Sequence, residues 1–188
     1  ETVHTVLALL YGLGLRLGEA CRLQVDDVDL VRSTLSIRQT KFYKTRITPF
    51  GPKLGSCLEQ YLALRRKAFP PLGPDDPLFA AFRRRPIGQG AIRGAFHTLL
   101  DGAGIGRSPG QGRPRLHDLR HTFAVHRLLR WYREGGDVQS HLPRLSTFMG
   151  HIDIHSTQVY LTVTSDLLDQ ANARFHRQFG SLLKEDPS

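Results

Sequence analysis

Six polar residues of this chain carry the side chains that a transfer reaction on a phosphodiester needs. They are Arg16, Lys41, His117, Arg120, His151 and Tyr160. When a nucleophile attacks a phosphodiester, the phosphorus becomes five-coordinate and its non-bridging oxygens gain negative charge. Two guanidinium groups can hold these oxygens with bidentate hydrogen bonds. Preorganised donors of this kind lower a barrier by on the order of 3–4 kcal/mol each, so the two arginines are candidate phosphate ligands.

Tyr160 is the candidate nucleophile, although a phenol attacks poorly at neutral pH because its pKa is about 10. A histidine can accept the phenol proton, and nearby arginine charges lower the pKa of the phenol. A lysine ammonium can give a proton to the departing 5′ oxygen. The combination of residue types therefore predicts cleavage of a DNA backbone by a tyrosine.

The short motifs around these residues place them on or next to helices. Arg16 lies in the stretch Gly-Leu-Arg-Leu-Gly-Glu of residues 14–19, at a junction between two expected helices. The stretch His-Asp-Leu-Arg of residues 117–120 opens a strongly helical segment, in which its first and last residues share a face. His151 follows a glycine after an apolar helix, and Tyr160 comes nine residues later.

The order and context of the six residues resemble the tyrosine recombinase (phage integrase) family over nearly the whole chain. The family pattern of Arg, Lys, His-x-x-Arg, His or Trp, and Tyr falls on the six positions. The resemblance implies that Arg16 and Arg120 bind the scissile phosphate and that His151 donates a hydrogen bond to it. It also implies that Tyr160 attacks the phosphorus and forms a 3′-phosphotyrosyl link.

The same resemblance implies supporting roles for three further groups. Lys41 would protonate the leaving 5′ hydroxyl, His117 would act as general acid and base near the tyrosine, and Glu19 would support Arg16. Lys44 is the other candidate for the general acid, because it lies in the same predicted hairpin turn. No metal and no cofactor is expected, because the cationic side chains neutralise the developing charge.

The implied function is that of a site-specific DNA recombinase of the integrase or transposase type, from a mobile element. Two alternatives stay open: a type IB topoisomerase, which shares the chemistry but relaxes DNA, and a non-catalytic DNA-binding relative. A zinc helix is a third interpretation of His117 and His121, which stand at i and i+4. It is disfavoured because Asp118 replaces the glutamate expected after the first histidine, and no third ligand is evident.

The elements that must position these residues predict a mainly helical α+β fold with one small antiparallel sheet. Apolar periodicity indicates helices at the ranges listed at the end of this paragraph, and β-branched alternation indicates a hairpin of strands 33–38 and 45–50. A Gly- and Pro-rich basic loop is expected at 102–114. The helical ranges are 2–13, 18–24, 52–67, 88–101, 117–133, 143–149, 155–160 and 165–180.

We expect one domain, 1–188, the tyrosine recombinase catalytic domain, without the separate N-terminal core-binding domain of the family. Between Arg120 and His151 lie more residues than in compact family members; the additional ones fall near 131–143 and resemble those of some transposon recombinases. An amphipathic helix over 167–183 is expected to join protomers as a homo-oligomer, a tetramer, on DNA. The alternative is that this helix packs on its own domain.

The composition agrees with a DNA-acting protein in a reducing compartment. Lysine and arginine number 26 against 17 acidic residues, a formal charge of +9, which favours an anionic partner such as double-stranded DNA. Cys21 and Cys57 form no motif and are expected to be buried free thiols. No apolar run reaches membrane-spanning length. We therefore expect a bacterial cytoplasmic protein associated with the nucleoid, with no membrane partner.

Overall fold

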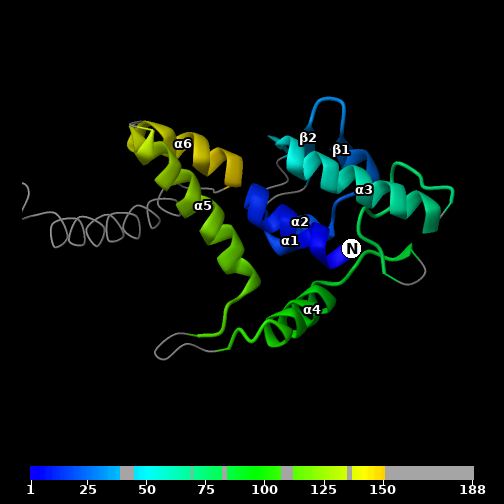
Figure 1. Cartoon of the computed structure of the whole chain (residues 1–188). Coiled ribbons are helices and arrows are strands. Elements are labelled where there is room, and N and C mark those ends of the chain that lie inside the picture. The colour runs from blue at the N-terminus through cyan, green and yellow to red at the C-terminus, as the bar shows by residue number, and fades with distance from the viewer. Residues whose placement is uncertain (39–44, 69, 82–83, 107–111, 135–136, 151–188) are drawn as a thin grey trace, which may run out of the picture. The chain divides into compact units, whose positions relative to one another are not determined.

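A computed structural model describes residues 1–38, 45–68, 70–81, 84–106, 112–134 and 137–150 of the chain (Figure 1). It contains two compact units. The first comprises residues 1–123 and 148–150, and the second comprises residues 124–147 and 151–188. Lys41, His151, Tyr160 and the predicted C-terminal helix lie outside the described residues, and so does the hairpin turn.

The described elements confirm the predicted mainly helical α+β fold. The helices are α1 (Thr2–Leu13), α2 (Leu17–Cys21), α3 (Pro52–Ala68), α4 (Gln89–Gly102), α5 (Leu116–Arg133) and α6 (Val138–Met149), with a 3-10 turn at Val25–Asp27. The strands are β1 (Val28–Asp29), β2 (Thr34–Ile37) and β3 (Arg46–Pro49), which form one antiparallel sheet in the order β1-β2-β3. Strand β1 was not predicted, because two residues are too few to show a periodicity.

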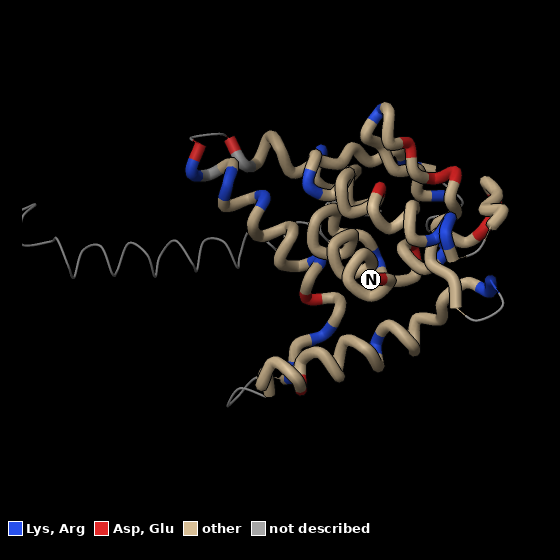
Figure 2. The backbone as a smooth tube through the Cα atoms, turned by 45° about the vertical axis from the view of Figure 1, so that its right-hand side comes forward, with Lys and Arg blue, Asp and Glu red and all other residues tan. Residues whose placement is uncertain are grey.

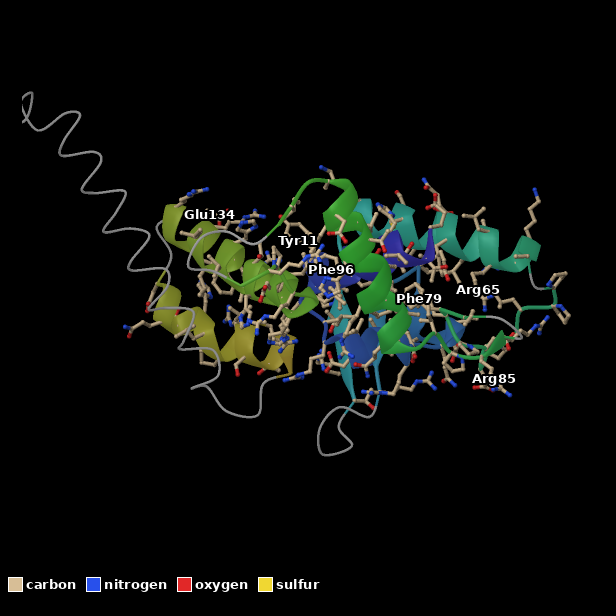
Figure 3. The ribbon with its side chains drawn as sticks, turned by 90° about the horizontal axis from the view of Figure 1, so that it is seen from below. Tyr11, Arg65, Phe79, Arg85, Phe96 and Glu134 are labelled. Carbon is tan, nitrogen blue, oxygen red and sulfur yellow. The ribbon has the colours of Figure 1, made fainter. Side chains whose placement is uncertain are left out.

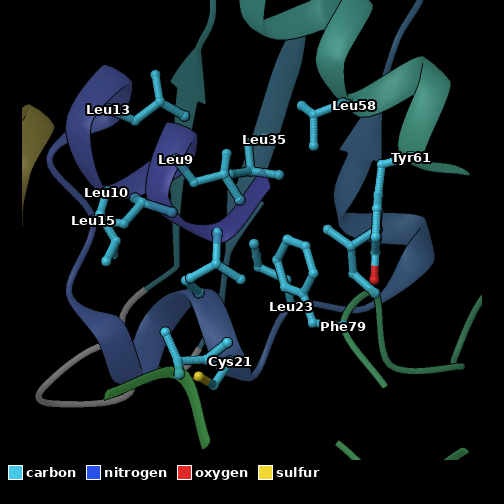
Figure 4. Close-up of a cluster of buried hydrophobic side chains, with 14 of the residues drawn as sticks. Leu9, Leu10, Leu13, Leu15, Cys21, Leu23, Leu35, Leu58, Tyr61 and Phe79 are labelled. Carbon is cyan, nitrogen blue, oxygen red and sulfur yellow. The ribbon is translucent and has the colours of Figure 1, made fainter. Parts of the chain in front are cut away.

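The core of the first unit forms where α1 and α3 meet β2. Helix α1 buries Val6, Leu9, Leu10 and Leu13, whose spacing repeats with the turn of a helix. Strand β2 alternates, with its second and fourth residues buried. Figure 4 shows the side chains of this cluster, which Phe79 joins from the segment after the Pro-rich loop.

Arg65 fixes the return of the chain after α3. Its side chain is buried, and Nε donates to the carbonyl of Leu78 at 3.2 Å while Nη2 donates to the carbonyl of Pro77 at 3.0 Å. Figure 3 shows Arg65 and Phe79 in this region of the first unit. Burying a guanidinium is costly unless it is hydrogen-bonded, and these two carbonyls provide partners for Nε and Nη2 at the edge of the core.

The prediction for α6 was wrong at its beginning. We expected the helix to begin at Pro143, but it begins at Val138 and contains Pro143. Asp137 supplies the reason, because its Oδ1 accepts the backbone N–H groups of Gln139 at 3.0 Å and Ser140 at 3.4 Å. A carboxylate in this position satisfies the donors at the start of a helix. A proline in the second turn lacks a backbone N–H and so removes one hydrogen bond of the helix.

The second unit contains an aromatic contact within the segment that we singled out as additional. The rings of Trp131 and His141 lie 4.8 Å apart between centroids, at an interplanar angle of 32°. Leu128, Leu142 and Leu145 are buried. The additional residues are thus mostly helical, in the last turns of α5 and the first turns of α6.

The two cysteines differ in burial. Cys21 is buried, as expected, and burial raises the pKa of its thiol. Cys57 is only half-buried, so this part of the expectation was wrong. Within the described residues, the structure contains no helix that is both long and apolar enough to span a membrane.

Gly14→Ala is expected to destabilise the fold, because Gly14 ends α1 with φ of 62°, a left-handed conformation. A Cβ at this position would lie 2.5 Å from Cδ1 of Phe123. The left-handed conformation alone costs a non-glycine residue roughly 1–2 kcal/mol, so we expect a loss of at least about 2 kcal/mol in the free energy of unfolding by urea denaturation.

Gly94→Ala is the matched control for this measurement. Gly94 lies inside α4, and a Cβ there meets nothing within 4 Å. An alanine in the interior of a helix is favoured over glycine by about 1 kcal/mol, so this variant should gain stability. Equal effects of the two substitutions would contradict the role assigned to Gly14.

Candidate active site

The loop between α1 and α2 positions Arg16. Leu15 is buried and anchors the loop, and Arg16 is the N-cap residue of α2. The backbone N–H of Arg16 donates to Oε2 of Glu19 at 2.9 Å, and its side-chain Nη1 donates to Oε1 of the same carboxylate at 3.1 Å. The Arg-x-x-Glu spacing thus closes the first turn of α2 and orients the arginine.

Glu19 is buried and holds a second arginine, from strand β3. Arg46 donates from Nη1 to Oε1 at 3.0 Å and from Nη2 to Oε2 at 2.8 Å. Burial by itself raises the pKa of Glu19. The hydrogen bond and charge of Arg46, together with those of Arg16, outweigh burial and hold the pKa of Glu19 below its ordinary value of 4.5. Glu19 is therefore a carboxylate at neutral pH.

Arg120 lies in the second turn of α5 and is fully buried at 1% exposure. Its Nη1 donates to the carbonyl of Gly14, and its Nη2 donates to the carbonyl of Met149 at 2.9 Å. The arginine thus joins the end of α1 to the end of α6. Gly14, whose carbonyl Arg120 binds, lies two residues before Arg16, so the two arginines meet the same short segment of the chain.

Three consecutive carbonyls at the end of α6 each accept a hydrogen bond from a different arginine. Phe148 accepts from Nε of Arg46 at 3.1 Å, Met149 accepts from Arg120, and Gly150 accepts from Nη1 of Arg16 at 3.0 Å. The last carbonyls of a helix have no partner within it and carry its negative dipole end. The three guanidinium groups therefore fix the end of α6, and with it the residue that precedes His151.

Gly150 is fitted to this arrangement. Its φ is 67°, and a Cβ would lie 2.5 Å from Nη1 of Arg46. A glycine is required here both by the left-handed backbone and by the guanidinium packed against it. The glycine of the Gly-His motif thus has a packing role that the sequence did not reveal.

His117 lies in the first turn of α5 and contacts His121 one turn later. The two rings meet edge to face with their centroids 4.5 Å apart. Desolvation by the surrounding protein lowers the pKa of His117, and the positive charges of His121, Arg120 and Arg115 lower it further. The side chain is neutral at pH 7, the state that a proton acceptor needs.

A cavity of about 490 Å³ connects Arg16 and His117 on the first unit. Basic and histidine side chains from α4 and the start of α5 complete its polar lining, and among the residues described no carboxylate lines it. These side chains are Arg93, His97 and Arg115. A cavity with this charge is suited to an anionic group. Elsewhere, lysines and arginines are spread along the described backbone rather than confined to one segment (Figure 2).

The structure thus brings three of the predicted site residues together in one unit: Arg16, His117 and Arg120. It does not describe Lys41, Lys44, His151 or Tyr160. Arg46 is the residue that sequence reasoning missed, although it lies in the second strand of the predicted hairpin, five residues after Lys41. The sequence offered no indication of its partners, because they lie in other segments of the chain.

No group of three or more histidine, cysteine, aspartate or glutamate side chains that could hold a metal ion occurs in the described parts of the chain. In the structure, His117 and His121 contact one another through their rings.

The chain is similar to known proteins in both sequence and fold. The phage integrase family matches residues 2–166. The integrase/recombinase y4rB of Sinorhizobium fredii (strain NBRC 101917 / NGR234) is 36% identical over 178 residues, which cover 95% of this chain and 57% of that protein. Tyrosine recombinase XerA of Thermococcus kodakarensis is 32% identical over 172 residues, which cover 90% of this chain and 54% of that protein. A crystal structure of XerA recombinase matches with a TM-score of 0.70 at 30% identity, and the match covers 93% of this chain and 57% of the XerA chain.

The chain belongs to the phage integrase family, and the resemblance found in its motifs is confirmed. It spans little more than half the length of these relatives.

His117 should titrate below the ordinary histidine value of 6.5. A lowered pKa means that the fold favours the neutral ring, so its contribution to stability is present above pH 6.5 and is lost as the pH falls through the folded value. His121→Ala should raise the pKa of His117, because the charge of His121 contributes to the lowering. NMR titration of the imidazole resonances measures the pKa of His117 in both proteins. A pKa of His117 at or above 6.5 in the unmodified chain would contradict the prediction.

Proposed function

We propose that residues 1–188 form the catalytic domain of a site-specific DNA recombinase, of the integrase or transposase type, from a mobile element. The observation that carries this proposal is the convergence of Arg16 and His117 on one cavity without a described carboxylate lining, with Arg120 bound to the Gly14 carbonyl beside it. The relatives named as tyrosine recombinases support the same reaction class.

The proposed reaction transfers a DNA phosphodiester to Tyr160 and back. The phenol oxygen attacks the phosphorus, and His117 accepts the phenol proton. The bond from phosphorus to the 5′ oxygen breaks, and Lys41, rather than Lys44, gives that oxygen a proton. The product is a 3′-phosphotyrosyl link that conserves the energy of the bond. A 5′ hydroxyl of a second strand then reverses the steps and releases the tyrosine.

In this scheme the charge that develops on the phosphate oxygens is neutralised by protein cations. Arg16 and Arg120 hold the non-bridging oxygens, and His151 donates a further hydrogen bond. The reaction therefore needs no metal ion or cofactor. The protein would act on double-stranded DNA of the bacterial nucleoid, in the cytoplasm, as a tetramer joined through the helix of residues 167–183.

Covalent capture tests the proposal. The 188-residue chain is incubated with a pool of nicked duplexes of random sequence, in which the cleaved end diffuses away and prevents religation. We expect an adduct that survives denaturant, with the DNA on the peptide that contains Tyr160, as identified by mass spectrometry. Attachment to another residue, or no adduct with any duplex, would overturn the proposal. Relaxation of supercoils without exchange between two sites would instead favour the topoisomerase alternative.

A further inference from the structure

Arg46 occupies a position between the two halves of the candidate site. Its side chain is 12% exposed. Its described hydrogen bonds go to the carboxylate of Glu19 and to the carbonyl of Phe148. On one side it meets both oxygens of Glu19, which also binds Arg16. On the other side it holds the carbonyl of Phe148, at the end of the helix that leads to His151.

The charges of this cluster explain why a second arginine is needed. Glu19 orients Arg16, but a carboxylate that is 3.1 Å from a guanidinium also cancels its charge. The bidentate ion pair with Arg46, at 2.8 Å, neutralises Glu19 instead. Two guanidinium groups and one carboxylate carry a net charge of +1, and the more exposed guanidinium is the one that can present it to an anion. Arg16 is 36% exposed and lines the cavity, whereas Arg46 is enclosed.

The fit of Gly150 is an independent observation on the same residue. The backbone at Gly150 approaches Nη1 of Arg46 so closely that no side chain can stand between them. The carbonyl of Gly150 then accepts from Arg16. One guanidinium therefore sets the distance between β3, α2 and the peptide before His151.

We infer that Arg46 is a positioning residue for strand transfer, which neutralises Glu19 so that Arg16 keeps its charge for the DNA phosphate, and which holds the end of α6 in place. The inference rests on the proposed function for its catalytic part. Arg46 itself touches no reacting atom, so its loss should alter the rate of the chemical step and not the chemistry.

Single-turnover capture of nicked DNA, with the protein in excess, tests the role in catalysis. The DNA probe is a nicked duplex that the unmodified chain captures. For Arg46→Met we expect the rate constant at saturating protein to fall by about 10- to 100-fold, with an unchanged final amplitude and a dissociation constant within about threefold. Arg46→Lys keeps the positive charge but cannot bind Glu19 with two parallel N–H groups. Its rate constant should lie between those of Arg46→Met and the unmodified chain. A reduced amplitude with an unchanged rate constant would show a structural role only and would overturn the inference.

Arg32→Met is the matched control, because Arg32 also pairs with a carboxylate but its side chain is 82% exposed, in the turn before β2. It should leave the rate constant unchanged. If Arg32→Met slows capture as much as Arg46→Met does, the effect is one of general charge and the inference is wrong.

A measurement without DNA separates this inference from the proposed function. Titration of the Glu19 carboxyl carbon by NMR follows the pair directly. In Arg46→Met the pKa of Glu19 should rise, whereas in Arg32→Met it should not change. If the pKa of Glu19 rises but no chain captures DNA, the proposed function has failed and the charge coupling stands. If the pKa of Glu19 is unaffected by Arg46→Met, the inference fails whatever the capture assay shows.

Discussion

Tyr160→Phe is expected to abolish covalent capture of nicked DNA, with a decrease of at least about 10³-fold. Phenylalanine keeps the ring but has no oxygen to bond to phosphorus, so no adduct can form at this position. DNA binding should change by less than about threefold, because the arginines that we propose as phosphate ligands are untouched. Denaturing gels measure the adduct, and a mobility-shift titration measures binding.

Tyr61→Phe is the control for the loss of a tyrosine hydroxyl. Tyr61 is buried in the core beside Phe79, and its hydroxyl lies 3.3 Å from Oγ1 of Thr2. Its loss should cost about 1 kcal/mol of stability and leave capture intact. Capture that persists in Tyr160→Phe would show that the nucleophile is another residue.

Glu19→Ala is expected to have the largest effect on stability, a loss on the order of 3–5 kcal/mol in the free energy of unfolding. The carboxylate is 4% exposed and accepts from both Arg16 and Arg46. Its removal leaves a nearly buried guanidinium without its counter-charge. The double variant Glu19→Ala with Arg46→Met should recover part of this loss, because both charges of the pair are then absent. Urea denaturation measures each variant.

Asp29→Ala provides the comparison for an exposed pair with the same spacing. Asp29 binds Arg32 at 3.2 Å, three residues on, near the surface. Exposed ion pairs contribute about 0–1 kcal/mol. If Glu19→Ala costs no more than Asp29→Ala, the buried cluster does not stabilise the fold as described.

The same carboxylate predicts how stability depends on pH. The pKa of Glu19 is lowered in the fold, so its contribution is present above the ordinary value of 4.5 and is lost as the pH falls through the folded value. Unfolding midpoints measured from pH 7 downward should therefore fall less steeply in Glu19→Gln than in the unmodified chain. Parallel curves would show that the ionised form of Glu19 is not specifically stabilised.

The sequence predicted those parts of the fold that depend on local periodicity. The long helices α1, α3, α4 and α5 lie close to the predicted ranges, because each buries a stripe or begins with a suitable residue such as Pro52. The sequence did not predict the first turn of α6. A helix that is capped by Asp137 and contains Pro143 has residue types that are also typical of a loop.

The candidate site was predictable to the extent that its residue types stand in short motifs. Arg16, His117 and Arg120 could be named because each lies in a recognisable stretch. The part played by Arg46 could not, since its partner Glu19 is far away in the sequence and its other partner is a backbone carbonyl. Main-chain acceptors are the same at every position, so no sequence pattern reveals which of them a side chain will meet.

The three carbonyls at the end of α6 couple the geometry of the candidate site to the folding of several segments. Their donors come from three separate segments: the loop after α1, the strand β3 and the helix α5. A chain in which one of these segments has not docked lacks one of the three hydrogen bonds that hold the residues before His151. If the chain cleaves DNA as proposed, we expect this activity to require that all three segments are folded.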